Sequence, residues 1–91
     1  MATLRLDLRV IECLTARDRR RQMQAIMDRL HRSFNVAVAD IESVAEADRA
    51  VLFVATVGRT RRDARLTLDR VADAVASHPR AEVLAHDFNE A

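Results

Sequence analysis

The chain has 91 residues, of which 49% are hydrophobic and 32% are charged, with one glycine and one proline, so it is neither disordered nor collagen-like. This length predicts a single domain over residues 1–91. The formal net charge of +1 excludes bulk electrostatic attraction to nucleic acid or membranes, so any electrostatic site requires local clustering of charge.

The first part of the chain predicts a strand, a helix and a second strand. Residues 4–10 alternate apolar and charged side chains, as in a strand with one buried face. Thr15 and Asp18 have the spacing of a helix N-terminal cap. The helix that follows places these apolar side chains on one stripe: Met23, Ile26, Met27, Leu30 and Phe34. Asn35 is expected to end this helix, and residues 36–41 to form a short edge strand.

A surface loop, with room for a short helical turn, is expected over residues 42–49, because this segment is acidic and poor in apolar residues. Residues 50–57 are almost continuously apolar, which is typical of a central strand buried on both faces. Gly58 ends that strand.

A second helix and a last strand complete the predicted order. Thr60 and Asp63 repeat the cap spacing, and the expected buried stripe of the helix is Ala64, Leu68, Val71, Ala72 and Val75. The helix stops at Ser77-His78-Pro79. The last strand is expected over residues 81–88 and alternates, with Leu84, His86 and Phe88 on one side and Val83 and Ala85 on the other.

This β-α-β-β-α-β order is the split βαβ pattern of ferredoxin-like folds. We expect an α+β sandwich with a four-stranded antiparallel sheet and both helices on one face. Right-handed crossovers are expected to bring the first and third strands side by side and parallel, so that both helices start at one edge of the sheet. The other face of the sheet is then uncovered.

Arginine is concentrated at both predicted helix starts. The candidate anion-binding or RNA-binding residues are Arg17, Arg19, Arg20, Arg21, Arg59, Arg61, Arg62 and Arg65. Cations at a helix N-terminus oppose the helix dipole, and guanidinium groups bind phosphate in pairs of hydrogen bonds, so this placement favours a polyanion ligand. The alternative is a solvated surface. All fifteen Lys and Arg residues of the chain are Arg, so clusters of arginine also arise from composition alone. In addition, Asp18 and Asp63 can neutralise neighbouring arginines.

The uncovered sheet face is a second candidate surface. It is expected to show Arg5, Asp7 and Arg9 together with Ala37 and Ala39. Tyr and Trp are absent from the sequence and the third strand carries one ring, Phe53, so base stacking of the RNA-recognition-motif type is excluded. An apolar centre with a polar rim favours a homodimer, which a charge at Val54 should disrupt. The alternative is an ordinary exposed face.

The sequence does not contain a complete catalytic constellation. His31, His78 and His86 lack a nucleophile or carboxylate at a pairing spacing, and one glycine cannot build a phosphate-binding loop. Cys13 is the one cysteine, so it is either a small buried hydrophobe or a thiolate activated by the nearby arginines. We therefore predict no enzyme activity, no catalytic residue, no metal and no cofactor. No disulfide, leader or membrane span is indicated, so a cytoplasmic location is expected.

Four stretches carry a resemblance to a known family. Thr-Ala-Arg-Asp-Arg-Arg-Arg begins at Thr15, Asp28-Arg29-Leu30 follows, and Phe-Asn-Val-Ala-Val-Ala-Asp ends at Asp40. Together with Ser77-His78-Pro79, they make the chain similar to the YlxP-like family of small bacterial proteins, whose biochemical function is uncharacterised. The resemblance implies a ferredoxin-like fold. Family genes often lie beside those of translation initiation and ribosome maturation factors, which implies a context near the ribosome.

The functional hypothesis is a non-catalytic accessory protein that binds structured RNA or a ribosomal subunit through an arginine-rich edge. It does not involve membranes or sequence recognition of DNA. The alternative hypothesis is a homo-oligomeric module that binds a protein or a small ligand with the open face of the sheet.

Overall fold

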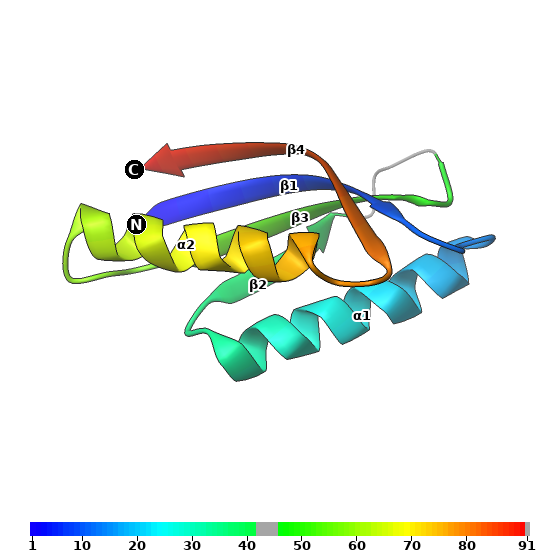
Figure 1. The fold of residues 1–91 in the computed structure, drawn as a ribbon, viewed down its shortest axis with the longest axis horizontal. Helices are drawn as coiled ribbons and strands as arrows, with labels where there is room; N and C mark the ends of the chain where they lie inside the picture. Colours follow the sequence, from blue (N-terminus) through cyan, green and yellow to red (C-terminus); the bar gives the residue numbers. More distant parts are fainter. Residues whose placement is uncertain (42–45, 91) are drawn as a thin grey trace.

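The structure, a computed structural model, describes residues 1–41 and 46–90. Its elements, in chain order, are β1 (Ala2–Val10), α1 (Ala16–Ser33), β2 (Ala37–Ile41), β3 (Arg49–Thr56), α2 (Arg61–Ala76) and β4 (Ala81–Glu90) (Figure 1). Half of the predicted loop over residues 42–49, at 42–45, lies outside the described residues. Residues 46–48 form a bend and turn, and β3 already begins at Arg49. The predicted βαββαβ order is confirmed.

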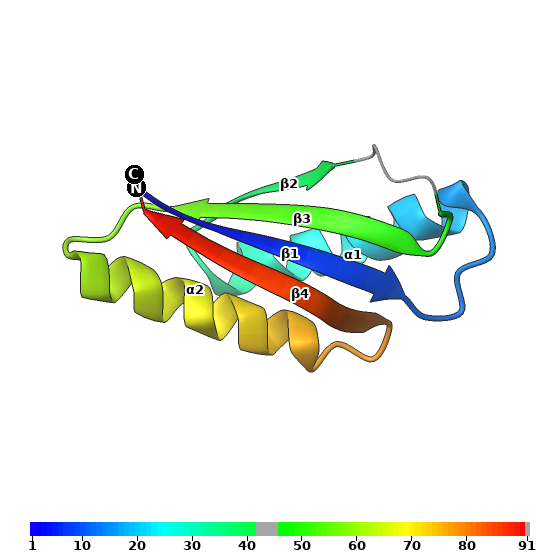
Figure 2. The same ribbon diagram turned by 90° about the horizontal axis from the view of Figure 1, so that it is seen from above.

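The four strands form one antiparallel sheet in the order β2-β3-β1-β4. Both helices lie on the same side of this sheet (Figure 2). α1 contacts β2 and β3, whereas α2 contacts β1, β3 and β4. The predicted ferredoxin-like α+β sandwich is therefore confirmed, and the other face of the sheet is open.

The predicted parallel orientation of the two central strands is wrong. β1 and β3 are neighbours, as expected, but they pair antiparallel, with Ala2 opposite Thr56 and Leu8 opposite Ala50. The reason is topological. A crossover helix makes β1 and β2 run in the same direction, and the following β2-β3 turn reverses the chain, so β3 must run against β1. The two helices consequently begin at opposite ends of the sheet (Figure 1).

The core lies between the sheet and the helices. Every second residue of β1 is buried, and Leu6 and Leu8 are completely shielded from solvent. In β3 the buried set is Ala50, Leu52, Val54 and Thr56, while the residues between them are less buried and Phe53 is exposed. The prediction that β3 is buried on both faces is therefore wrong, because the helices cover one face of the sheet. Val54 points to the helices and does not lie on the open face.

The helix boundaries follow the predicted caps. Thr15 is the N-cap of α1 and accepts a hydrogen bond from the Asp18 backbone N–H at 3.1 Å. Thr60 caps α2 in the same way through the Asp63 backbone N–H, also at 3.1 Å. Each hydroxyl satisfies a backbone donor that has no partner within the helix. Most residues of the predicted stripes are buried in the core: Met23, Ile26, Leu30, Ala64, Leu68, Val71 and Val75. The others, Met27, Phe34 and Ala72, are partly buried against it, and Phe34 is the C-cap that follows α1.

β4 contains a bulge that changes the side on which its residues lie. Val83 pairs with Leu8, but Ala85 pairs with Asp7, so Leu84 is the extra residue. Val83 therefore shares the helix side of the sheet with Leu8, while Ala85 lies on the open side with Asp7. The predicted placement of Val83 and Ala85 on one side is wrong, because strict alternation does not hold across a bulge.

Candidate polyanion-binding surface

The two predicted arginine clusters do not share a surface. One begins α1 and the other begins α2, and these helix starts lie at opposite ends of the sheet (Figure 1). α1 alone has 18 residues, which corresponds to a length of about 27 Å. The expectation that all eight guanidinium groups face one edge is therefore wrong. The two clusters have to be considered as separate surfaces.

Arg19 is a structural residue of the first cluster. It is 6% exposed, and its guanidinium donates a hydrogen bond to the backbone carbonyl of Glu46 at 3.0 Å. This contact fastens the first turn of α1 to the segment that leads into β3. A side chain that is buried and bonded in this way cannot also reach a phosphate outside the protein, so Arg19 is removed from the candidate surface.

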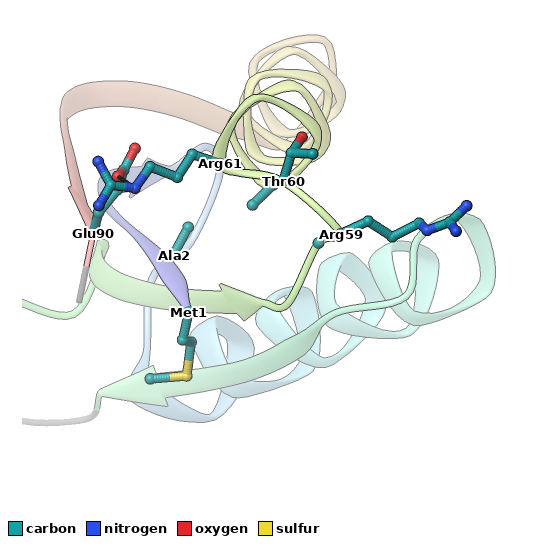
Figure 3. A pocket seen from close by; sticks show the side chains of 8 residues that line it. Met1, Ala2, Arg59, Thr60, Arg61 and Glu90 are labelled. Carbon is teal, nitrogen blue, oxygen red and sulfur yellow. Dashed lines mark ion pairs between the residues drawn. The ribbon is translucent and has the colours of Figure 1, made fainter.

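The second cluster is partly engaged within the protein. Arg61 pairs with Glu90 at 3.5 Å, and Arg65 pairs with Asp69 at 3.2 Å while its guanidinium carbon lies 3.9 Å from the centre of the Phe88 ring. Figure 3 shows Arg61 extended toward Glu90 and Arg59 pointing the opposite way. Arg59 and Arg62 are exposed. Two of the four guanidinium groups here are thus already balanced by carboxylates.

A hollow of about 210 Å³ lies beside the start of α2 (Figure 3). Gly58 is part of its wall, and a Cβ atom at this position would lie 2.7 Å from the backbone nitrogen of Ala64. Gly58 is therefore needed for the close approach of this loop to the helix. The hollow itself is shared by Arg61 and Glu90, whose ion pair lowers its positive charge.

The first cluster continues along the outer face of α1. Arg21 follows Arg17 by four residues, and Arg32 follows Arg21 by eleven, which is close to three helical turns. These spacings place the three side chains on one face of the helix. We call the exposed arginines of this helix the α1 stripe: Arg17, Arg20, Arg21, Arg29 and Arg32.

Arg17 and Arg21 of the α1 stripe form no ion pair within the described part of the chain. Asp28, an acid on the same helix, instead accepts a hydrogen bond from the uncharged side chain of Gln24 at 2.8 Å. The outer face of α1 therefore presents guanidinium groups to solvent over a length of about 22 Å from Arg17 to Arg32.

Charge is segregated between α1 and the rest of the chain. α1 contains six arginines and two aspartates, which gives it a formal charge of +4. Because the whole chain has a formal charge of +1, the remaining residues sum to −3. The near-neutral net charge is thus the sum of a basic helix α1 and an acidic remainder of the chain, which we call the acidic body. Such a stripe is the electrostatic pattern of a surface for polyanions.

Arg29 and Arg32 are members of this surface that the sequence-based prediction missed. The prediction considered arginine runs at helix starts, and these two residues lie further along α1. A signal was present in the sequence, since Arg32 has helical spacing from Arg21. By contrast, the burial of Arg19 has no such signal, because it depends on where the Glu46 carbonyl lies in the fold.

The remaining chemical candidates do not assemble a site. Within residues 1–41 and 46–90, no three histidine, cysteine or carboxylate side chains gather in a way that suits a metal ion. Cys13 is half-buried against the core, and its thiol lies 3.2 Å from the Thr15 carbonyl oxygen and 3.4 Å from that of Ala47. Its position is that of a packing residue. His31 and His86 are exposed on different elements.

His78 makes the stability of the fold depend on pH. Its Nδ1 accepts a hydrogen bond from the Arg80 backbone N–H at 3.1 Å, in the turn that ends α2. Burial, followed by the charges of Arg29 and Arg80, lowers the pKa of His78 below its usual value of 6.5. The neutral imidazole is the form that fits the native structure, because a protonated Nδ1 cannot accept this hydrogen bond.

We expect His78→Asn to reduce the dependence of stability on acid. A histidine whose pKa is lowered by folding contributes its full stability above 6.5 and loses it as the pH falls through the folded pKa. Urea unfolding at neutral pH and at about pH 5 should show a larger loss of unfolding free energy for the wild-type protein than for the variant. Equal losses in both proteins would contradict this linkage, since all other titrating groups are shared.

Comparisons with known proteins give a family and no activity. Neither α1 nor α2 is long and apolar enough to cross a membrane. No curated protein matches the chain. A family model described as "Protein of unknown function (DUF503)" matches residues 1–88, and the chain therefore belongs to that family.

Proposed function

We propose that this protein binds the phosphate backbone of folded RNA through the α1 stripe, as a non-catalytic accessory protein. The observation that carries the proposal is the segregation of charge, with +4 on α1 and −3 on the remaining residues. Guanidinium groups donate paired hydrogen bonds to phosphate oxygens, and several along one helix can follow successive phosphates. The net negative charge of the acidic body disfavours binding of the same polyanion elsewhere on the protein.

RNA fits this surface better than a membrane does. A helix that lies on a bilayer inserts an apolar face, but the apolar face of α1 is packed into the core through Met23, Ile26 and Leu30. The α1 stripe can contact a charged backbone without insertion. Because guanidinium groups spaced along one helix can follow successive phosphates, we propose recognition of RNA shape and phosphate positions, without sequence recognition of DNA.

The proposed context is translation or ribosome maturation. It is supported by the resemblance of residues 15–40 to the YlxP-like family, whose genes often lie beside those for such factors. A ribosomal subunit presents folded RNA at high density and is the partner that we propose. Cytoplasmic location follows from this partner.

Salt titration of RNA binding tests the proposal. If Arg17, Arg21, Arg29 and Arg32 each neutralise one phosphate, log Kobs is expected to fall with log[salt] with a slope of about −4. Fluorescence anisotropy of a labelled RNA duplex of about 20 base pairs should show this slope, and the protein should co-sediment with ribosomal subunits at low salt. A slope near zero, or equal affinity for a DNA duplex of the same sequence, would contradict RNA recognition by this surface.

A further inference from the structure

The open face of the sheet is apolar over β2 and β3. The strand register places three pairs of apolar residues on it: Ala37 with Ala55, Ala39 with Phe53, and Ile41 with Val51. Phe53 is 39% exposed, and Ile41 is exposed beside it. This group of six residues, which we call the apolar half of the open face, lies on the side of the sheet away from both helices (Figure 2).

Within the apolar half, a large side chain stands beside a hollow. The hollow has a volume of about 230 Å³ and is lined by Thr3, Ala37, Ala39 and Ala55 next to the Phe53 ring. A second hollow of about 390 Å³ shares Ala37 and Ala55 and continues toward Val57. The small alanine side chains create this space, and a phenylalanine ring is of a size to enter it. The face thus carries an exposed ring beside a recess lined by small side chains.

The rest of the open face, on β1, β4 and the first residue of β3, has balanced charge. By register, three arginines and three acids share this side of the described sheet: Arg5, Arg9, Arg49, Asp7, Glu82 and Asp87. Arg5 pairs with Asp7 at 3.0 Å, and Arg9 pairs with Glu82 at 3.0 Å. A face without net charge does not attract a polyanion, and it does not repel a copy of itself.

We propose that the open face of the sheet binds the same face of a second copy of this chain. In a two-fold arrangement each copy inserts Phe53 into the alanine-lined hollow of the other, since a projection and a recess on one surface are self-complementary. The ion-paired halves form the rim on both sides. Two sheets packed in this way have the geometry of a sandwich with interdigitated side chains.

The proposed dimer is independent of the RNA-binding proposal and compatible with it. α1 lies on the covered side of the sheet (Figure 2). In the proposed dimer the two α1 stripes therefore face outward on opposite sides. The apolar half contains six residues, which is fewer than the roughly 20–30 per side of a standard interface. We therefore expect reversible association in the micromolar range.

Sedimentation velocity over about 1 µM to 1 mM tests the dimer, because its population depends on protein concentration. Phe53→Glu removes the projection and Ala39→Arg fills the recess. Each substitution is expected to weaken dimerisation at least tenfold, while the matched control Leu66→Glu, at a residue 46% exposed on α2, leaves it unchanged. Circular dichroism checks that each variant is folded.

A wild-type protein that is monomeric at the highest concentration would overturn the proposal. A dimer that persists unchanged in either Phe53→Glu or Ala39→Arg would also overturn it, since the contact would then lie on another face. Loss of the dimer in Leu66→Glu as well would assign association to the helices.

Discussion

Reversing two charges of the α1 stripe, with Arg17→Glu and Arg21→Glu, is expected to lower the affinity for folded RNA by about 100-fold or more at low salt. Each lost phosphate contact should reduce the salt slope by about one, so the slope should fall by about two. Arg17 and Arg21 are exposed and lie one turn apart on the outer face of α1. Anisotropy titrations at several salt concentrations measure both effects.

This variant is expected to remain folded. Arg17 lies in the first turn of α1, where a negative charge favours the helix dipole by about 0.3–1 kcal/mol. Repulsion between the new glutamates one turn apart offsets this gain by about 0.2–0.5 kcal/mol. Urea unfolding should therefore give a free energy within about 1 kcal/mol of the wild-type value.

The matched control is Arg59→Glu with Arg62→Glu, which makes the same change in net charge at the opposite end of the molecule (Figure 1). We expect it to retain most of the RNA affinity. Equal losses in the two variants would mean that binding follows net charge alone. A loss confined to the control would place the site at the start of α2, where Arg59 and Arg62 are exposed.

Leu6→Ala is expected to cause the largest loss of stability from a single substitution. Leu6 lies in the middle of β1, is completely buried, and pairs with Leu52 of β3 and His86 of β4. Removing a buried leucine side chain from a core costs about 2.7–5 kcal/mol, because burial is lost and a cavity remains. For a domain of this size, that loss lowers the melting temperature by at least about 10 °C.

Leu66→Ala provides the control for this substitution. It removes the same atoms from an exposed position on α2, so the expected change is within about 0.5 kcal/mol. Calorimetry and urea unfolding of both variants measure the difference. A similar loss at the two positions would contradict the division into a covered core and an exposed helix surface.

The elements of this fold follow from local patterns in the sequence. The threonine caps at Thr15 and Thr60 and the apolar stripes of both helices depend on residues within one or two turns of each other. Such local patterns do not depend on how the elements are arranged in the tertiary structure. This is why the order of elements and the helix-covered face of the sheet could be predicted.

Features that depend on distant parts of the chain could not be predicted in the same way. Arg19 resembles its neighbours in the sequence, but it is buried because the Glu46 carbonyl, 27 residues away, lies within 3.0 Å of its guanidinium group. The position of the β4 bulge depends on pairing with β1. The orientation of β3 was open to prediction, since the order of crossover and hairpin determines it.

For the candidate surface too, features set by local sequence patterns could be predicted, and features that depend on the tertiary fold were missed. Arg17, Arg20 and Arg21 were predicted as site residues and are exposed on α1. Helical spacing alone would have been enough to predict that this surface extends to Arg32. Predicting that it is separate from Arg59 and Arg62 would have required the correct direction of β3. Whether these exposed arginines bind RNA stays a prediction.

The bulge at Leu84 lies on an edge strand of the sheet, where another chain could otherwise pair. β4 is an edge strand of ten residues, and a straight edge of that length would offer a row of backbone donors and acceptors to the edge of another molecule. The extra residue interrupts that row and increases the local twist of the strand. The bulge thereby hinders growth of the sheet into a continuous fibre through β4.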